Sequence, residues 1–417
     1  MKRILGLVVA LVMLVSIGTV GAAEDTKVTL EYWFALSGSL GEMVENLIAN
    51  YNASQSDVEV IATYQGTYHE TVGKVQQAIA AGTAPDVFML ERALVAYLAD
   101  AGVLLDMQSY VDAAGMSDFF NPGLMGHSYF EGELISLPFN RSTPILHVNK
   151  TMLDELGLAV PDTWADLEAV ANALIIKDGD ETARYGVTMP YDTWYPIAMT
   201  TQAGGMLINE DQTDLGCIEN GELVKALSFI KGLENDGALI YPPPGYGGDY
   251  CNQLFIEGKV GILFNSTGAI GGLKDLVDFE YVTAFLPQDV KRATPTGGAN
   301  VAILTTTKHP DEAWGFIEWA MKDQEHGVLP FIVQSGYVPF ADAFIESDAI
   351  QDLWAEFPMY RTAYEQLQYA IDTNKTIHWP ELNVEMLTMI EAIMYDDADI
   401  PSAVEAFRDE AVRILSQ

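Results

Sequence analysis

The chain is 417 residues long, and 49% of its residues are hydrophobic while 19% are charged, which excludes a disordered chain and allows more than one packed domain. It carries 59 acidic and 21 basic residues, a formal net charge of −38 at pH 7. Because nucleic acids and anionic lipid surfaces are bound by clustered positive charge, this balance excludes both as electrostatic partners.

The N-terminus has the pattern of a secretory signal peptide. Lys2 and Arg3 precede an apolar run over 4–17, and small residues lead to a cleavage site after Ala23. The apolar run is shorter than the roughly 20 residues of a membrane-spanning helix. We therefore predict that 1–23 is a signal peptide, without a lipid anchor because no cysteine lies near the cut, and that the protein is periplasmic or extracellular.

The predicted elements then alternate between strands and helices. Strands are expected at 28–33, 58–63 and 86–90, and helices at 40–51 and 71–81. This order predicts an α/β fold with a largely parallel sheet.

The same alternation continues through the middle of the chain, and the C-terminal part is helical. Helices are expected at 164–174, 222–233, 310–321 and over most of 340–417, and strands at 260–264 and 301–305. No linker of biased composition separates the expected domains. We therefore predict that the chain crosses between two domains more than once.

Cys217 and Cys251 are the two cysteines of the sequence. In an oxidising compartment such a pair tends to close, so we predict a disulfide between them; two free, buried thiols are the alternative. The bridge would stabilise the fold by about 3–4 kcal/mol in the chain-entropy model.

The sequence lacks the common catalytic and cofactor motifs. It contains no HExxH, GxSxG, GxGxxG, P-loop or CxxC pattern, and its histidines lack metal-ligand spacing. We therefore expect no enzyme, no cofactor and no metal site. Paired carboxylates leave no motif, so a secreted glycoside hydrolase is the alternative from another class.

Seven short motifs, in order along nearly the whole mature chain, resemble the extracellular solute-binding proteins of bacterial ABC importers, in the sugar-binding group that includes maltose-binding protein. The motifs are Tyr64-Gln-Gly-Thr-Tyr68, Ala80-Ala-Gly-Thr-Ala-Pro-Asp86, Leu137-Pro-Phe-Asn-Arg-Ser-Thr-Pro144, Pro161-Asp-Thr-Trp164, Phe255-Ile-Glu-Gly-Lys259, Gly297-Gly-Ala299 and Gly336-Tyr-Val-Pro339. The first and third of them are most similar to the binders of glycerol-3-phosphate and glycerophosphodiesters.

The resemblance implies an α/β, two-lobed periplasmic binding protein fold with a multi-stranded hinge and a ligand cleft between the lobes. The implied N-terminal lobe is 24–138 plus 286–330, and the C-terminal lobe is 139–285 plus 331–417. The protein would be a monomer that captures a small polyhydroxy solute, a glycerol-3-phosphate, a glycerophosphodiester or a sugar. It would deliver this solute to the transmembrane subunits of an ABC permease. A binding protein that presents its loaded lobe to a receptor is a second interpretation, and the sequence does not separate the two roles.

The resemblance also implies ligand-binding residues from both lobes and from the crossover between them. Glu91 would accept two hydroxyls on one carboxylate, and Tyr337 would close over the ligand. The implied set is Tyr68, Glu91, Ser142, Tyr191, Trp194, Ser266, Thr267, Gly298, Tyr337 and Lys375.

One departure from the resembled group affects the expected ligand. Phosphate-binding members carry an arginine in the C-terminal region, where this chain offers Lys375, which lacks the fork of a guanidinium. The negative net charge also opposes an anion, so a phosphate would need Lys375, Arg141 or backbone N–H groups. A neutral mono- or oligosaccharide is therefore nearly as well supported. The acidity is spread along the chain, which is typical of a solvated surface and hints at a saline habitat.

Overall fold

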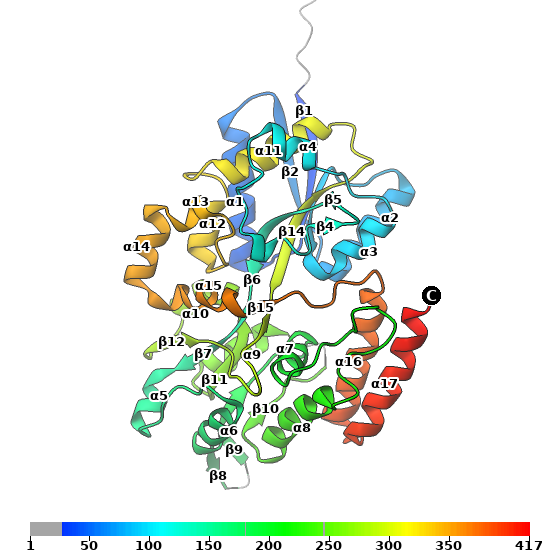
Figure 1. The fold of residues 1–417 in the computed structure, drawn as a ribbon. Coiled ribbons are helices and arrows are strands. Elements are labelled where there is room, and N and C mark those ends of the chain that lie inside the picture. Colours follow the sequence, from blue (N-terminus) through cyan, green and yellow to red (C-terminus); the bar gives the residue numbers. More distant parts are fainter. Residues whose placement is uncertain (1–26, 180, 245–246) are drawn as a thin grey trace, which may run out of the picture.

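The computed structural model describes residues 27–179, 181–244 and 247–417. Figure 1 shows two lobes, each built around its own sheet, with chain segments passing between them. The predicted signal peptide at 1–23 lies outside the described residues. Within the described part, no helix is both long and apolar enough to span a membrane.

The first sheet has the strand order β2-β1-β3-β14-β6. Its strands are β1 (Val28–Phe34), β2 (Val58–Tyr64), β3 (Val87–Glu91), β6 (Leu137–Ser142) and β14 (Gly297–Ile303). β1 pairs in parallel with β2 and β3, as the N-terminal alternation of strands and helices predicts. β14 is antiparallel to both β3 and β6. The reason is that β6 runs towards the crossing into the second lobe, whereas β14 enters the first sheet after the chain has returned from that lobe.

The second sheet has the order β10-β9-β11-β7-β12, with β8 added beside β9. Its strands are β7 (Pro144–Asn149), β8 (Ile176–Asp178), β9 (Glu181–Thr188), β10 (Leu239–Ile240), β11 (Val260–Ser266) and β12 (Tyr281–Ala284). β6 ends at Ser142 and β7 begins at Pro144, so the chain passes from the first sheet to the second through the single residue Thr143. Two short pairs complete the strands: β4 (Tyr129–Phe130) with β5 (Glu133–Leu134), and β13 (Thr294–Pro295) with β15 (Ala370–Ile371).

Helices cover both sheets. Beside the first sheet lie α1 (Gly38–Ser54), α2 (Tyr68–Ala81), α3 (Val95–Asp100), α4 (Gln108–Ala113), α11 (Pro310–Lys322), α12 (Val328–Ser335), α13 (Asp342–Ile345) and α14 (Asp348–Glu356). Around the second sheet and the hinge lie α5 (Lys150–Glu155), α6 (Trp164–Ala173), α7 (Trp194–Gln202), α8 (Glu222–Asn235), α9 (Gly248–Ile256), α10 (Ile270–Lys274), α15 (Thr362–Gln366), α16 (Trp379–Tyr395) and α17 (Ile400–Leu415).

The exact lobe boundaries stay a prediction. The prediction assigned 331–417 to the C-terminal lobe, whereas α12 contacts α1 and α11, and Figure 1 shows α12, α13 and α14 beside the first sheet. α16 and α17 pack on each other, and α17 packs on α8 of the second lobe. We therefore propose that the chain crosses between lobes a third time, between α14 and α16.

One buried side chain joins the three segments that cross between the lobes. Gln366 Nε2 donates to the Pro144 carbonyl at 2.8 Å and to Thr143 Oγ1 at 3.1 Å, both on the first crossing. Its Oε1 accepts from the backbone N–H of Leu286, on the second crossing, at 2.7 Å. Gln366 itself lies on the proposed third crossing, so its amide links the backbones of all three segments.

Arg141 is a second polar centre of the hinge. The side chain is fully buried, and Nε donates to the carbonyl of Gly297 at 3.0 Å. Nη1 donates to the Leu124 carbonyl and to Asn300 Oδ1, both at 3.0 Å, and Nη2 to Thr296 Oγ1 at 2.9 Å. Burial lowers the pKa of the guanidinium to about 9, which leaves it protonated at neutral pH. These donors hold β6 to β14, so Arg141 has a structural role.

The predicted disulfide is wrong, and the alternative of two free thiols is correct. Cys217 and Cys251 are both fully buried and free. They belong to different hydrophobic clusters, and the Sγ of Cys251 accepts a hydrogen bond from Thr188 Oγ1 at 3.4 Å. Burial raises the pKa of Cys217 to about 12 and that of Cys251 to about 11, so neither thiol is reactive in the folded protein.

His147 makes the stability of the second lobe sensitive to pH. It is fully buried on β7; Nε2 donates to the Ser266 carbonyl at 3.2 Å, and Nδ1 accepts from the hydroxyl of Tyr281 at 2.6 Å. Burial lowers its pKa from 6.5 to about 4. Between these two values the unfolded chain binds a proton that the native state does not bind. Stability from this group is therefore complete above pH 6.5 and falls as the pH drops towards 4.

We expect the free energy of unfolding to fall by about 3 kcal/mol between pH 7 and pH 4 because of the protonation of His147 alone. Urea unfolding of the wild type and of His147→Gln across this range measures the difference, because other titrating groups are common to both. The variant should show the weaker pH dependence. Equal pH dependence in the two proteins would contradict the assignment.

Candidate ligand-binding cleft

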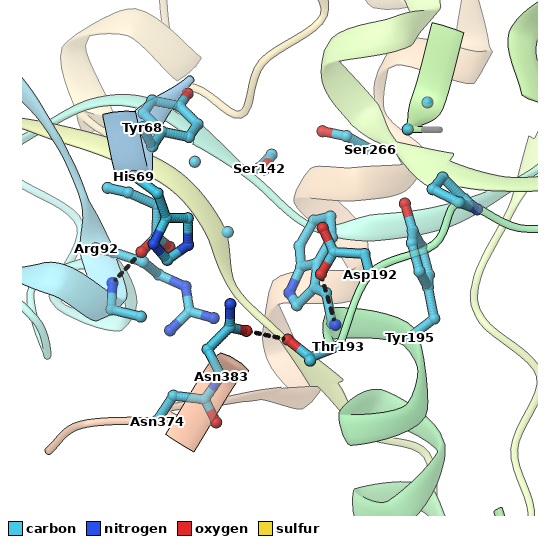
Figure 2. A pocket seen from close by; sticks show the side chains of 18 of the residues that line it. Tyr68, His69, Arg92, Ser142, Asp192, Thr193, Tyr195, Ser266, Asn374 and Asn383 are labelled. Atoms are coloured by element: carbon cyan, nitrogen blue, oxygen red, sulfur yellow. Dashed lines mark hydrogen bonds between the residues drawn. The ribbon is translucent and has the colours of Figure 1, made fainter. Parts of the chain in front are cut away.

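A cavity of about 350 Å³ lies between the two lobes. The first lobe contributes the start of α2 and the end of β3, and the second lobe contributes the segment leading into α7 and the end of β11. The hinge strands β6 and β14 line it with Ser142, Gly297 and Gly298, and this side is called the floor of the cleft. Figure 2 shows side chains from these elements converging on the open space between them.

The structure brings eight of the ten predicted residues together in this cleft. The eight are Tyr68, Glu91, Ser142, Tyr191, Trp194, Ser266, Gly298 and Tyr337. They come from positions almost 270 residues apart in the chain, so their convergence is a property of the fold. Their contact with a ligand stays a prediction.

The other two predicted residues lie outside the cleft lining. Thr267 is fully buried, and its Oγ1 donates to the carbonyl of Gly336 at 2.7 Å. Lys375 Nζ donates to the carbonyl of Gly126 at 2.7 Å on the protein surface. Both polar groups are therefore engaged in contacts within the protein. Lys375, which was predicted to bind a phosphate, contacts the carbonyl of Gly126 instead.

Glu91 is the charged residue that the first lobe presents at the end of β3. Its Oε2 accepts from the backbone N–H of Ala93 at 2.9 Å, which caps the short 3₁₀ turn that follows the strand. Burial raises the pKa of this carboxyl group, against the opposing effect of Arg92. Glu91 therefore caps a turn and lines the cleft at the same time.

Arg92 is a cleft residue that the sequence analysis missed. Its Nη1 donates to the carbonyl of Thr373 and to Nε2 of His127, both at 3.0 Å. Its Nε is buried without a hydrogen-bond partner among the described residues, and burial lowers the pKa of the guanidinium. The signal available in the sequence was its place beside Glu91 at the end of a buried strand.

Asp192 is the corresponding charged residue of the second lobe, and it was also missed. Its Oδ1 accepts from the backbone N–H of Trp194 at 2.8 Å, and desolvation inside the cleft raises its pKa, although part of the residue stays exposed. An aspartate just before a helix is usually explained as a cap, which conceals a second role. Its position between the predicted residues Tyr191 and Trp194 was the available signal.

The aromatic residues of the cleft are held by hydrogen bonds and by close backbone contacts. Tyr68 Oη accepts from Asn140 Nδ2 at 2.8 Å, and Trp194 Nε1 donates to the carbonyl of Thr296 at 3.3 Å. The indole lies so close to Gly297 that a Cβ there would be 2.3 Å from its Cζ2. Gly298 has φ +78°, and a Cβ would lie 1.8 Å from the Asn140 carbonyl. Glycine is therefore required at both positions by the approach of the floor strands and the indole.

Two asparagines bring the C-terminal segment to the cleft. Asn383 Oδ1 accepts from Thr193 Oγ1 at 2.7 Å, as Figure 2 shows. Asn374 adopts φ 63°, and its Oδ1 is buried without a partner among the described residues. Lys375 is the residue predicted from this segment, whereas the neighbouring Asn374 lines the cavity.

The cleft therefore combines aromatic faces with acceptor-rich polar groups. Carboxylates and amide oxygens accept hydrogen bonds from hydroxyls, and the rings offer surfaces for the apolar face of a sugar or glycerol. No group of three or more His, Cys, Asp or Glu side chains within the described residues is arranged to hold a metal ion. This chemistry is suited to binding a small polar solute.

Two α/β lobes around a shared cleft, joined by short strand crossings, define the class of two-lobed periplasmic binding proteins. Comparison with known families agrees: the model of the bacterial extracellular solute-binding protein family matches residues 46–358. The chain belongs to this family. The predicted fold class, the predicted family and the general function of solute capture are thereby confirmed, and the relatives are solute-binding proteins rather than enzymes.

Individual relatives are distant in sequence but cover almost the whole chain. The sn-glycerol-3-phosphate-binding periplasmic protein UgpB of Rhizobium meliloti is 24% identical over 402 residues, covering 90% of this chain and 91% of that protein. An ABC substrate-binding protein from Listeria monocytogenes in complex with cycloalternan has a TM-score of 0.83 at 20% identity, covering 94% and 99%. UgpB from Mycobacterium tuberculosis in complex with glycerophosphocholine has a TM-score of 0.82 at 21% identity, covering 93% and 98%.

Proposed function

We propose that this protein is the exported, substrate-binding component of an ABC importer that captures a polyhydroxy solute, with a saccharide favoured over a phosphate monoester. The observation that carries this proposal is the pair of carboxylates, Glu91 and Asp192, which line the cleft from opposite lobes among aromatic rings. A carboxylate accepts two hydroxyl hydrogen bonds at once, and such charge-assisted bonds are about twice as strong as neutral ones. The signal peptide and the permease partner belong to this proposal.

The charges of the cleft argue against a phosphate monoester. Glu91 and Asp192 face a single guanidinium, that of Arg92, while Lys375 and Arg141 are engaged elsewhere. A dianion in this surrounding would add to an existing excess of negative charge. A glycerophosphodiester, with one negative charge on its phosphate, is the second candidate, because the unpartnered Nε of Arg92 is a donor in the same cleft.

Transport would depend on lobe closure and would include no chemical step. A ligand that contacts Glu91 on one lobe and Asp192 on the other stabilises the closed arrangement, so ligand binding shifts the population towards it. The permease would then bind the closed form. The lobes would close by rotating about the short crossings, which the hydrogen bonds of Gln366 hold together.

Isothermal titration calorimetry and thermal melting with a panel of solutes test the proposal. The panel contains glucose, maltose, trehalose, glycerophosphocholine and sn-glycerol-3-phosphate. We expect a saccharide to bind and to raise the melting temperature, since a ligand at 100 times its Kd stabilises the native state by about 2.7 kcal/mol. Tighter binding of sn-glycerol-3-phosphate than of every sugar would contradict the preference, and hydrolysis of a glycoside would contradict a pure binding function.

A further inference from the structure

The charged side chains of the cleft are unbalanced. Glu91 and Asp192 supply two carboxylates, and Arg92 supplies one guanidinium. The ion pairs found among the described residues involve neither Glu91 nor Asp192. Figure 2 shows Asp192 and Tyr195 on one wall of the cleft, with His69 and Arg92 on the facing wall. Asp192 is exposed to the cleft and interacts with Arg92 and His69 across it, as Glu91 also does, so two carboxylates share one guanidinium and the lining keeps an excess of negative charge.

The cleft also has hydrogen-bond acceptors that lack donors among the residues that the structure describes. Asp192 accepts at Oδ1 from the N–H of Trp194, which leaves acceptor capacity on its carboxylate. Asn374 lines the same cavity, is 7% exposed, and has an Oδ1 that is buried without a partner in the described part of the chain. These acceptors are complemented by a group that only donates, and an ammonium group has three donors and no acceptor.

Aromatic rings surround the same wall. Trp194 and Tyr195 follow Asp192 directly, with ring centroids 5.7 Å apart and planes inclined by 55°, and both line the cavity. A cation near an aromatic face is attracted by about 0.5–2 kcal/mol, depending on how far it is desolvated. A formal net charge of −38 also raises the local concentration of cations around the whole protein.

We propose that the polyhydroxy ligand carries a cationic nitrogen group and that Asp192 is the residue that binds this group. The inference rests on the proposed function and narrows it to a chemical class. Two sources share the positive charge: an amino sugar, whose ammonium group also donates hydrogen bonds, and the quaternary ammonium of a choline-type glycerophosphodiester, which has no N–H and would be held by charge and aromatic faces alone. In the second case the phosphodiester would face Arg92 on the opposite wall, and the zwitterion would match both charges.

Calorimetry with two matched pairs of probes tests the inference. The pairs are glucosamine against glucose, and glycerophosphocholine against sn-glycerol-3-phosphate. In the wild type we expect the nitrogen-bearing member of one pair to bind at least tenfold more tightly than its partner, and the successful pair identifies the source. Asp192→Asn should reduce this ratio about tenfold. Asp211→Asn, an exposed acid of the second lobe outside the cleft, removes the same formal charge and should leave the ratio unchanged.

The outcomes separate this inference from the proposed function. Binding of glucose, maltose or trehalose without binding of either nitrogen-bearing probe would overturn the inference and leave the proposed function standing. The same ratio in Asp192→Asn and the wild type would overturn the assignment to Asp192. Binding of no panel member would overturn both proposals. The wild-type comparison decides the ligand class by itself, so a variant that fails to fold does not remove the test.

Discussion

Replacement of Arg141 by methionine is expected to lower the free energy of unfolding by about 3–5 kcal/mol. Methionine keeps the volume of the side chain but removes four hydrogen bonds, to Gly297, Leu124, Asn300 and Thr296. Each buried acceptor left without a donor costs about 1–3 kcal/mol, and the relief of burying a guanidinium offsets part of that cost. The midpoint of urea unfolding measures the effect.

The matched control for this prediction is Arg413→Met. Arg413 lies on α17 with 58% of its side chain exposed, where it pairs with Glu410. Exposed ion pairs contribute about 0–1 kcal/mol, so this variant should unfold close to the wild type. Similar stabilities of the Arg141 and Arg413 variants would show that the buried hinge network is not a major source of stability.

Replacement of Glu91 by alanine is expected to weaken solute binding by about 100-fold, which corresponds to about 2.7 kcal/mol. A hydrogen bond from a hydroxyl to a carboxylate contributes about 1.5–3 kcal/mol, so the expected loss corresponds to at least one such bond. Replacement of Trp194 by alanine removes the indole face that would contact the solute and should weaken binding at least tenfold. Calorimetry with the tightest-binding member of the solute panel measures both variants.

Two further substitutions separate binding from folding. Glu168→Ala makes the same change on the exposed face of α6 and should leave the affinity unchanged. Glu91→Gln keeps the shape and the cap on Ala93, so it should retain the melting temperature of the free protein while it weakens binding. An unchanged affinity in Glu91→Ala would remove Glu91 from the site.

Local sequence patterns were sufficient for the secondary structure. The helix expected at 71–81 is α2, which begins at Tyr68 because Thr67 and Glu70 form a capping box in front of it. The strand expected at 301–305 is β14, which spans Gly297–Ile303 because pairing with the hinge strand β6 extends it towards Gly297. Hydrophobic periodicity identifies such elements, whereas their ends depend on caps and on partner strands.

Cleft residues that belong to a family motif could be predicted from the sequence. Cleft residues whose position depends on tertiary packing could not. Tyr68 and Ser142 were found from motifs that resemble the family. Asp192 and Arg92 lie next to predicted residues, but each also has a local structural role that explains it equally well in sequence. Asn374 and Lys375 are neighbours in one segment, and only the fold determines which of the two reaches the cavity.

The sequence by itself determined the order of strands and helices, the α/β class, the family and seven of the aromatic and polar residues that line the cleft. These features follow from short-range patterns and motifs that are contained in one stretch of chain. Tertiary structure alone decided that Cys217 and Cys251 stay apart, that Lys375 is directed to Gly126, and that Asp192 faces the wall of Arg92. The reason is physical: the partner of a side chain is set by residues brought beside it from distant parts of the chain, and those contacts exist only once the lobes have packed.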